Sequence, residues 1–213
     1  MMKLNNKDIR NILQNISTMF QEKMEELSKL DSLVGDGDHG VSMSRGAREA
    51  LVAIHSCDNQ ASIKQLFEVY ANALIQGVGG AVGPLFGSIF YEFAKATGHK
   101  DFFDVMMYKT AIENATEMVM MLGNAKANDK TMVDAMIASK EAMTTFDSFL
   151  ELTREVKDGA YQGVLNTIEM QAKKGRSKYR KEQSIGFQDA GATSYYYLVN
   201  EFYNYLSEVS INE

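Results

Sequence analysis

The sequence has little cysteine, little proline and no long hydrophobic run. Its single cysteine, Cys57, excludes an intrachain disulfide framework and favours a reducing compartment. Because Pro84 is the single proline, the rest of the chain is free of the residue that most strongly breaks helices. No run of about 18 apolar residues is present, and the N-terminus lacks the apolar stretch of a secretory signal. We therefore expect a soluble, cytoplasmic protein that does not act at a membrane.

Positive charge is also scarce. The 213 residues include 22 Lys and Arg against 28 Asp and Glu, which gives a net charge of −6. Nucleic-acid binding depends on clustered basic side chains that face phosphates, so this balance argues against a nucleic-acid partner. The apolar fraction of 45% is that of an ordinary globular protein, and the length is compatible with a single domain over 1–213.

Helical periodicity dominates the rest of the chain. Apolar residues recur at spacings of three and four from position 8 to 30, which predicts a first helix over about 6–29. Similar patterns predict further helices over 41–56, 61–77, 84–97, 101–122, 131–145, 149–171 and 193–209. No alternating pattern indicates a strand, and the stretch 173–192 reads as a long loop. We expect an all-α fold of eight helices, with the unusual loops between them.

The acidic segment 31–40 carries the strongest functional signal. Asp31, Asp36 and Asp38 place three carboxylates within eight residues, on what we expect to be a loop. Such charges repel one another unless a cation neutralises them, and Mg²⁺ takes oxygen ligands while leaving positions for phosphates. An EF-hand does not fit, because its turn glycine and its final glutamate are missing. A nucleotide–metal site and a solvated turn remain as alternatives.

Two glycine-containing segments each precede a predicted helix. Segment 79–84 can present backbone N–H groups and a helix N-terminus to an anion, although a plain turn between helices is an equal alternative. In the second segment, Asp189 shortly precedes Thr193 and Ser194, either of which is a candidate helix N-cap. Arg176 lies upstream and can pair with a phosphate, although a surface position is the usual one for arginine. Neither segment decides the function alone.

Taken together, these segments resemble the L subunit of bacterial dihydroxyacetone kinase and the matching domain of the ATP-dependent enzymes. The resemblance covers nearly the whole chain and depends on segments 35–40, 79–87, 129–135, 175–176 and 189–194. The first and the last are specific in their order and separation. The resemblance implies an eight-helix antiparallel barrel whose loops at one end hold ADP or ATP and two Mg²⁺ ions.

The resemblance also implies which residues form the site. Asp31, Asp36 and Asp38 would be the metal ligands. The nucleotide would be lined by His39, Gly40, Val41, Ser42, Gly80, Ala81, Gly123, Met132, Arg176, Asp189, Ala190 and Gly191. His39 would contact the nucleotide or orient an aspartate, whereas His55 and His99 have no expected part. No general base is expected on this chain, because phosphoryl transfer asks mainly for positioning and charge neutralisation.

The same resemblance implies partner subunits. In the members that depend on the sugar phosphotransferase system, bound ADP is rephosphorylated in place by a phosphodonor M subunit. The phosphoryl group then passes to dihydroxyacetone, or a similar short ketose, held by a separate K subunit. Because the chain has no room for a K domain, we expect the subunit form, and a homodimer is left open.

Several positions depart from the family pattern near the expected nucleotide. Val82 replaces a serine, Leu122 and Asn124 replace basic residues, Gln183 replaces an arginine and Ala190 a proline. Each lost hydrogen bond to a charged group removes on the order of 1.5 to 3 kcal/mol of binding free energy. A regulatory relative that binds nucleotide but is catalytically weakened is therefore an alternative to an active kinase subunit. A helical scaffold with a structural Ca²⁺ loop is a third reading.

Overall fold

Helices account for most of the chain in the computed structural model, which describes residues 2–211. In chain order they are α1 Asn6–Glu22, α2 Met24–Val34, α3 His39–Ser56, α4 Ile63–Gly77, α5 Val82–Thr97, α6 Val105–Gly123, α7 Met132–Ala142, α8 Phe149–Asn166 and α9 Ala190–Ile211. None of the described helices has the length and apolar character needed to cross a membrane.

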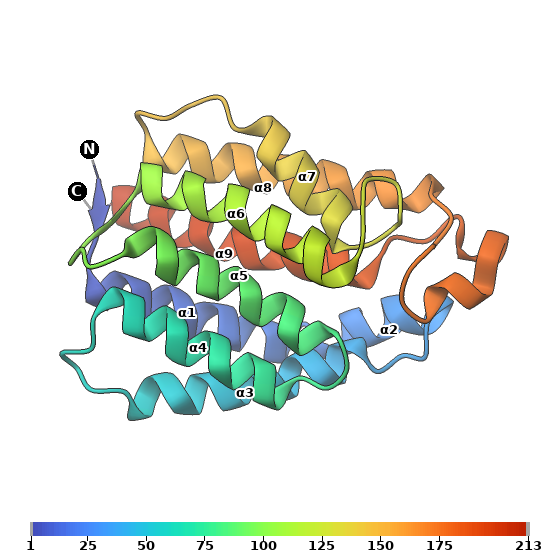
Figure 1. Cartoon of the computed structure of the whole chain (residues 1–213), viewed down its shortest axis with the longest axis horizontal. Coiled ribbons are helices and arrows are strands. Elements are labelled where there is room, and N and C mark those ends of the chain that lie inside the picture. Colours follow the sequence, from blue (N-terminus) through green and yellow to red (C-terminus); the bar gives the residue numbers. More distant parts are fainter. Residues whose placement is uncertain (1, 212–213) are drawn as a thin grey trace.

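The helices form a closed ring. From α3 to α9 each helix contacts the next one, α1 contacts α3, and α9 returns to contact α1. Figure 1 shows these helices side by side with nearly aligned axes, while α2 extends beyond one end of the ring. There α2 packs against α3 and α9. The all-α fold and the antiparallel barrel expected from the sequence are confirmed.

The hydrophobic core fills the inside of the ring. On α1 the apolar face predicted from periodicity is buried, with Ile9, Ile12, Leu13, Ile16 and Phe20 fully enclosed. At the centre, the ring of Phe93 has neighbouring ring centroids at 5.3 to 5.8 Å, those of Phe67, Phe103, Tyr108 and Phe202. Aromatic contacts of this kind bury large areas and here join five elements, α4, α5, β2, α6 and α9.

The first predicted helix is in fact two helices. Lys23 separates α1 from α2, and α2 runs on to Val34 instead of ending at 29. Asp31 therefore lies on the last turn of a helix and not in a loop, which corrects the prediction. No glycine or proline marks the break at Lys23, and the apolar spacing continues through it, so periodicity alone could not place it.

Short elements account for the other differences. Strands β1 Lys3–Leu4 and β2 Phe103–Asp104 pair antiparallel, although no strand was predicted. A two-residue strand is too short for alternation to appear. The helix predicted to reach 171 ends at Asn166 and is followed by a 3₁₀ turn, η1 Thr167–Glu169. The predicted long loop contains a second 3₁₀ helix, η2 Ser177–Ser184.

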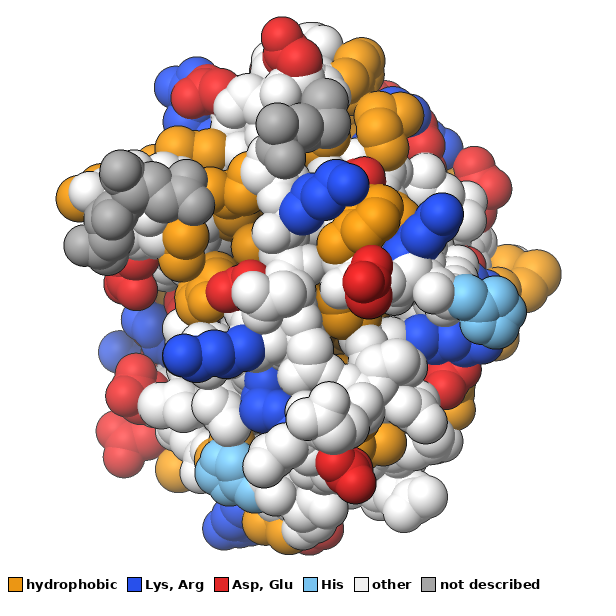
Figure 2. Space-filling view, turned by 90° about the vertical axis from the view of Figure 1, so that its left-hand side faces the viewer, with side chains coloured by type: hydrophobic (Ala, Val, Ile, Leu, Met, Phe, Trp, Pro, Cys, Tyr) orange, Lys and Arg blue, Asp and Glu red, His pale blue; other side chains and the backbone are white. Residues whose placement is uncertain are grey.

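The end of the barrel that carries β1 and β2 has a mixed surface. Acidic, basic and hydrophobic side chains are interspersed there, and histidines are visible among them (Figure 2). His55 lies in the last turn of α3 and His99 follows the end of α5, so both are far from the start of α3, where the acidic segment ends. The acidic segment therefore lies at the opposite end of α3 from His55.

Candidate functional site

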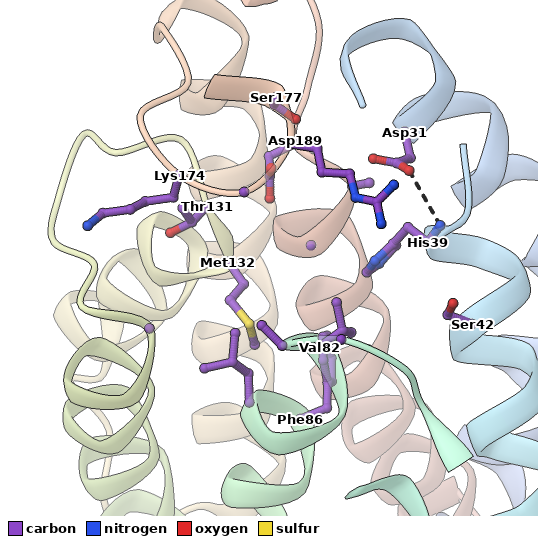
Figure 3. Close-up of a pocket in the computed structure, with 18 of the residues that line it drawn as sticks. Asp31, His39, Ser42, Val82, Phe86, Thr131, Met132, Lys174, Ser177 and Asp189 are labelled. Atoms are coloured by element: carbon purple, nitrogen blue, oxygen red, sulfur yellow. Dashed lines mark hydrogen bonds between the residues drawn. The ribbon is translucent and has the colours of Figure 1, made fainter. Parts of the chain in front are cut away.

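A cavity of about 690 Å³ opens at the end of the barrel where α2, α3, α5 and α9 meet. All three segments singled out in the sequence contribute to its walls, and so do residues between 119 and 133 and between 174 and 177. Figure 3 shows Asp31 and His39 on one side, Thr131 and Met132 on the other, and Val82 and Phe86 below. The barrel thus brings segments from most of the sequence to one site.

All but one of the residues expected in the site line this cavity. They are Asp31, Asp36, Asp38, His39, Val41, Ser42, Gly80, Ala81, Gly123, Met132, Arg176, Asp189, Ala190 and Gly191. Gly40 does not line it. A Cβ atom on Gly40 would lie 2.1 Å from the carbonyl oxygen of Met24 and 2.6 Å from the backbone nitrogen of Ser28. Gly40 is therefore a packing residue that lets α3 touch the backbone of α2.

The three aspartates converge although they belong to different elements. Asp31 lies on the last turn of α2, Asp36 lies in the connecting loop, and Asp38 directly precedes α3. One carboxylate oxygen from each lies within 4.8 Å of the other two. Burial and the neighbouring charge of Asp36 raise the pKa of Asp38. A hard divalent cation with oxygen ligands would relieve this repulsion, so the donor set fits Mg²⁺.

Arg176 supplies a cation beside the acidic cluster. Its guanidinium forms an ion pair with Asp36, and Nη2 lies 4.0 Å from Oδ2 of Asp38. The arginine side chain is 69% exposed, so water screens the pair and little free energy holds the two together. Arg176 can therefore turn to an incoming phosphate, for which its planar donors are well suited.

His39 joins α3 to α9. Its ring Nε2 lies 2.8 Å from Oγ of Ser194, and its backbone N–H donates to Oδ2 of Asp31 at 3.4 Å, the dashed line in Figure 3. Burial lowers the pKa of His39, against the opposing effect of Asp31, so the ring is neutral at neutral pH. His39 thus contacts Asp31 through its backbone and α9 through its ring.

The start of α9 forms another wall of the cavity. This helix begins at Ala190 and not at Thr193, because Oδ1 of Asp189 accepts a hydrogen bond from the Ala192 N–H at 2.7 Å and caps the helix. Thr193 donates its hydroxyl to the Asp189 carbonyl, so both predicted caps, Thr193 and Ser194, were wrong. Burial raises the pKa of Asp189 to about 6, although the Ala192 N–H and the Lys130 cation act in the opposite direction.

The glycine-rich segment provides the third wall. Gly80 has a φ of 68°, a conformation that glycine adopts without strain. Ala81 precedes α5 without any side-chain cap, so the first N–H groups of α5 are not taken by a capping side chain. Together with the positive end of the helix dipole, such groups are suited to an anion.

Comparison with known proteins identifies the family. The sequence profile of the DAK2 domain matches residues 33–204. The chain belongs to the DAK2 domain family. This DAK2 domain is 32% identical over 205 residues to the PEP-dependent dihydroxyacetone kinase, ADP-binding subunit DhaL, of Escherichia coli K12, covering 93% of the chain and 96% of that protein. It is 34% identical over 183 residues to the PTS-dependent counterpart from Lactococcus lactis, covering 84% and 88%.

A solved structure shares the fold. The crystal structure of the dihydroxyacetone kinase from C. freundii in complex with AMP-PNP and Mg²⁺ superposes on the DAK2 domain with a TM-score of 0.70 at 20% identity. The match covers 96% of the chain and 35% of that longer one. At this identity the likeness shows the fold alone. The family expected from the motifs is confirmed by the sequence comparisons.

The departures from the family pattern fall into two groups in this DAK2 domain. Val82 and Ala190 line the cavity, whereas Leu122, Asn124 and Gln183 do not. Asn124 has a left-handed backbone (φ 43°) and caps the C-terminus of α6, a position where asparagine is well tolerated. Only the first group directly changes the cavity wall.

Sequence analysis missed the floor of the cavity. Val82, Leu85, Phe86, Val119 and Met132 give it an apolar surface, of which only Val82 and Met132 were expected near the nucleotide. Leu85 and Phe86 belong to segment 79–87, so their place near the site could have been inferred. Val119 belongs to an ordinary helical pattern that contains no such signal. The cavity therefore combines an apolar floor with an acidic rim.

Proposed function

We propose that this DAK2 domain is the ADP-binding, Mg²⁺-dependent subunit of a kinase that phosphorylates dihydroxyacetone or a similar short ketose. The observation that carries the proposal is the convergence of three aspartates and the start of α5 on one cavity with an apolar floor. Alignment over 96% of the length of an ADP-binding subunit supports the subunit form, with 1–213 as a single domain.

In this proposal, each wall of the cavity binds a different part of the metal–nucleotide complex. Asp31, Asp36 and Asp38 would hold two Mg²⁺ ions, which neutralise phosphate charge when bound. The backbone N–H groups around Gly80 and Ala81 would receive phosphate oxygens. The apolar floor would take the adenine ring, as pockets for flat apolar rings usually do.

The residues of this chain position and shield the phosphates, and we assign none of them as a general base. His39, the one histidine in the described cavity, is neutral and bonded to Ser194. Phosphoryl transfer requires alignment and charge neutralisation above all, which the cavity's residues supply. A K subunit would hold the ketose that takes the phosphoryl group, and a phosphodonor M subunit would convert the resulting ADP back to ATP.

The proposal is tested by measuring ADP binding at millimolar Mg²⁺ with and without a chelator. We expect retention that depends on Mg²⁺, and a roughly 10- to 100-fold weaker affinity in Asp36→Asn, as loss of a charged contact predicts. Asp101→Asn, an exposed position after α5 and outside the cavity, is the matched control. A wild-type protein that does not bind ADP under these conditions would sink the proposal.

A second function, regulation by nucleotide binding without turnover, is favoured by Val82, which places an apolar side chain on the cavity wall. The family resemblance leads us to expect a serine hydroxyl at this position. The two functions separate when the protein is mixed with a K subunit, an M subunit and a ketose. Formation of ketose phosphate supports the kinase subunit. Tight ADP binding without ketose phosphate supports the regulator.

A further inference from the structure

Lys130 is a buried lysine outside the acidic cluster whose ammonium group faces backbone carbonyl groups. Its side chain is fully enclosed, and its backbone has a left-handed φ of 59°, which is costly for a residue other than glycine. The three N–H donors of Nζ are shared among four carbonyl oxygens within hydrogen-bonding distance, those of Thr167 at 2.7 Å, Met170 at 3.2 Å, Ser184 at 2.7 Å and Phe187. Burial of a charged lysine costs free energy and is rare in proteins, so its contact with neutral acceptors indicates a structural role.

The four carbonyl groups belong to the two ends of one excursion of the chain. Between Met170 and Phe187 the backbone leaves the barrel, forms η2 and returns; we call these residues the 170–187 segment. Its tip, 174–177, lines the cavity and carries Arg176. The acceptors in Thr167 and Met170 precede the tip, and those in Ser184 and Phe187 follow it, so one ammonium group joins both ends.

Other contacts also hold the base of the segment. The Gly186 N–H donates to the Ile168 carbonyl at 2.8 Å, and the Ala172 N–H donates to the Ser184 hydroxyl at 2.9 Å. The Lys173 N–H donates to the Asp129 carbonyl at 3.0 Å, while its exposed ammonium group reaches the Asn128 carbonyl and lies 3.7 Å from Oδ1 of Asp129. These are neutral or solvated hydrogen bonds, whereas a buried bond from a charged donor contributes about twice as much each.

We propose that Lys130 is a positioning residue, whose ammonium group fastens both ends of the 170–187 segment and so holds Arg176 at the mouth of the cavity. The functional half of this inference rests on the proposed nucleotide site, and the structural half does not. Asp189 lies close enough for its charge to favour the ammonium form, although burial lowers the pKa of Lys130. We call the contact of Lys130 with the four carbonyl groups the clamp. Because Asp189 caps α9, its charge couples the clamp electrostatically to the start of that helix.

Trypsin reports on the clamp directly, without any nucleotide. The segment contains six cleavage sites, Lys173, Lys174, Arg176, Lys178, Arg180 and Lys181. In Lys130→Ala we expect trypsin to cut these sites at least roughly tenfold faster than in the wild type. The reason is that the segment would detach locally while the barrel stays folded. Lys126→Met removes an exposed lysine from the same loop and is the matched control.

Chemical rescue separates positioning from general stability. Propylammonium replaces the part of the side chain that Lys130→Ala removes and can donate to the same carbonyl groups, so it should restore resistance to trypsin. Tetramethylammonium has the charge but no donor and should not. ADP affinity at saturating Mg²⁺ should fall in Lys130→Ala and recover with propylammonium, while the cooperative thermal transition of the barrel persists.

Three results would overturn the inference: unchanged trypsin resistance in Lys130→Ala, equal rescue by both ammonium ions, or loss of the cooperative transition in Lys130→Ala and the near-isosteric Lys130→Met alike. The last would assign Lys130 to the stability of the barrel. If the wild type fails to bind ADP, the proposed function fails, and the trypsin experiment still decides whether Lys130 clamps the segment.

Discussion

Arg176 pairs with Asp36 across 140 positions of the sequence. The contact joins the 170–187 segment to the loop between α2 and α3. It places a positive charge beside the three aspartates, where a metal ion would also bind. The arginine thus has two roles that oppose each other. It competes with a metal ion for Asp36, and it is available to a phosphate once the metal is bound.

We expect Arg176→Gln to change metal and nucleotide binding in opposite directions. Without nucleotide, Mg²⁺ should bind a few-fold more tightly, since removal of a screened charge at the surface is worth about 1 kcal/mol or less. At saturating Mg²⁺, ADP should bind roughly tenfold more weakly, because a charged hydrogen bond is lost. Titration calorimetry measures both, with Arg180→Gln, which lies outside the cavity, as control. A fall in both affinities would show that the arginine does not compete with the metal.

Asp189→Asn should stabilise the protein without ligand at high pH. The pKa of about 6 for Asp189 in the folded state lies above its unfolded value of about 3.9, so ionisation costs folding free energy above pH 6. The cost disappears as the pH falls below about 4. Asparagine is an equally good N-cap, so the Ala192 N–H keeps an acceptor.

Because Asp189 is partly exposed, we expect a gain of about 1 to 2 kcal/mol at pH 8 and none near pH 4. Urea unfolding at the two pH values measures the difference. Asp101→Asn, at an exposed position, should show no such pH dependence. A variant that is less stable than the wild type at pH 8 would contradict the assigned burial cost.

Gly40→Ala should weaken the packing of α3 on α2. The new methyl group would meet backbone atoms of Met24 and Ser28 that cannot turn away, which typically costs about 1 to 3 kcal/mol. Gly123→Ala is the control, because its nearest neighbours would be side-chain atoms at 3.6 and 3.8 Å, an ordinary contact distance. Thermal unfolding should separate the two variants. Equal stability would mean that α2 can shift to make room.

Val82→Ser should strengthen ADP binding. Val82 opens α5 and lines the cavity, so a hydroxyl at this position can reach a phosphate bound at the helix N-terminus. We expect up to about a tenfold gain at saturating Mg²⁺. Val52→Ser makes the same change at an exposed position of α3 outside the cavity and should have no effect. No gain in Val82→Ser would mean that the phosphates lie elsewhere.

Predictions from the sequence succeeded where the signal is local. The acidic trio and the glycine-rich loop are recognisable within a few residues, and α4 follows from its apolar periodicity. The aspartates were therefore found even though Asp31 was placed in a loop instead of on a helix.

The features of the site that could not be predicted from the sequence depend on tertiary contacts. The pair between Arg176 and Asp36 joins distant segments, and no local pattern indicates it. Gly40 was expected to line the nucleotide because the family resemblance implied it, whereas steric contact with α2 accounts for the glycine in this structure. Lys130 lies in a polar loop whose composition suggests an exposed lysine, and only the fold buries it.

The closure of the ring by α9 has a consequence for the order in which the protein is made. This helix carries the partner of the His39 ring, Ser194, and it completes the barrel by contact with α1. A ribosome delivers α9 after every other wall of the cavity has emerged. The ability to bind nucleotide is therefore acquired last. A nascent chain that still lacks α9 has an incomplete nucleotide site.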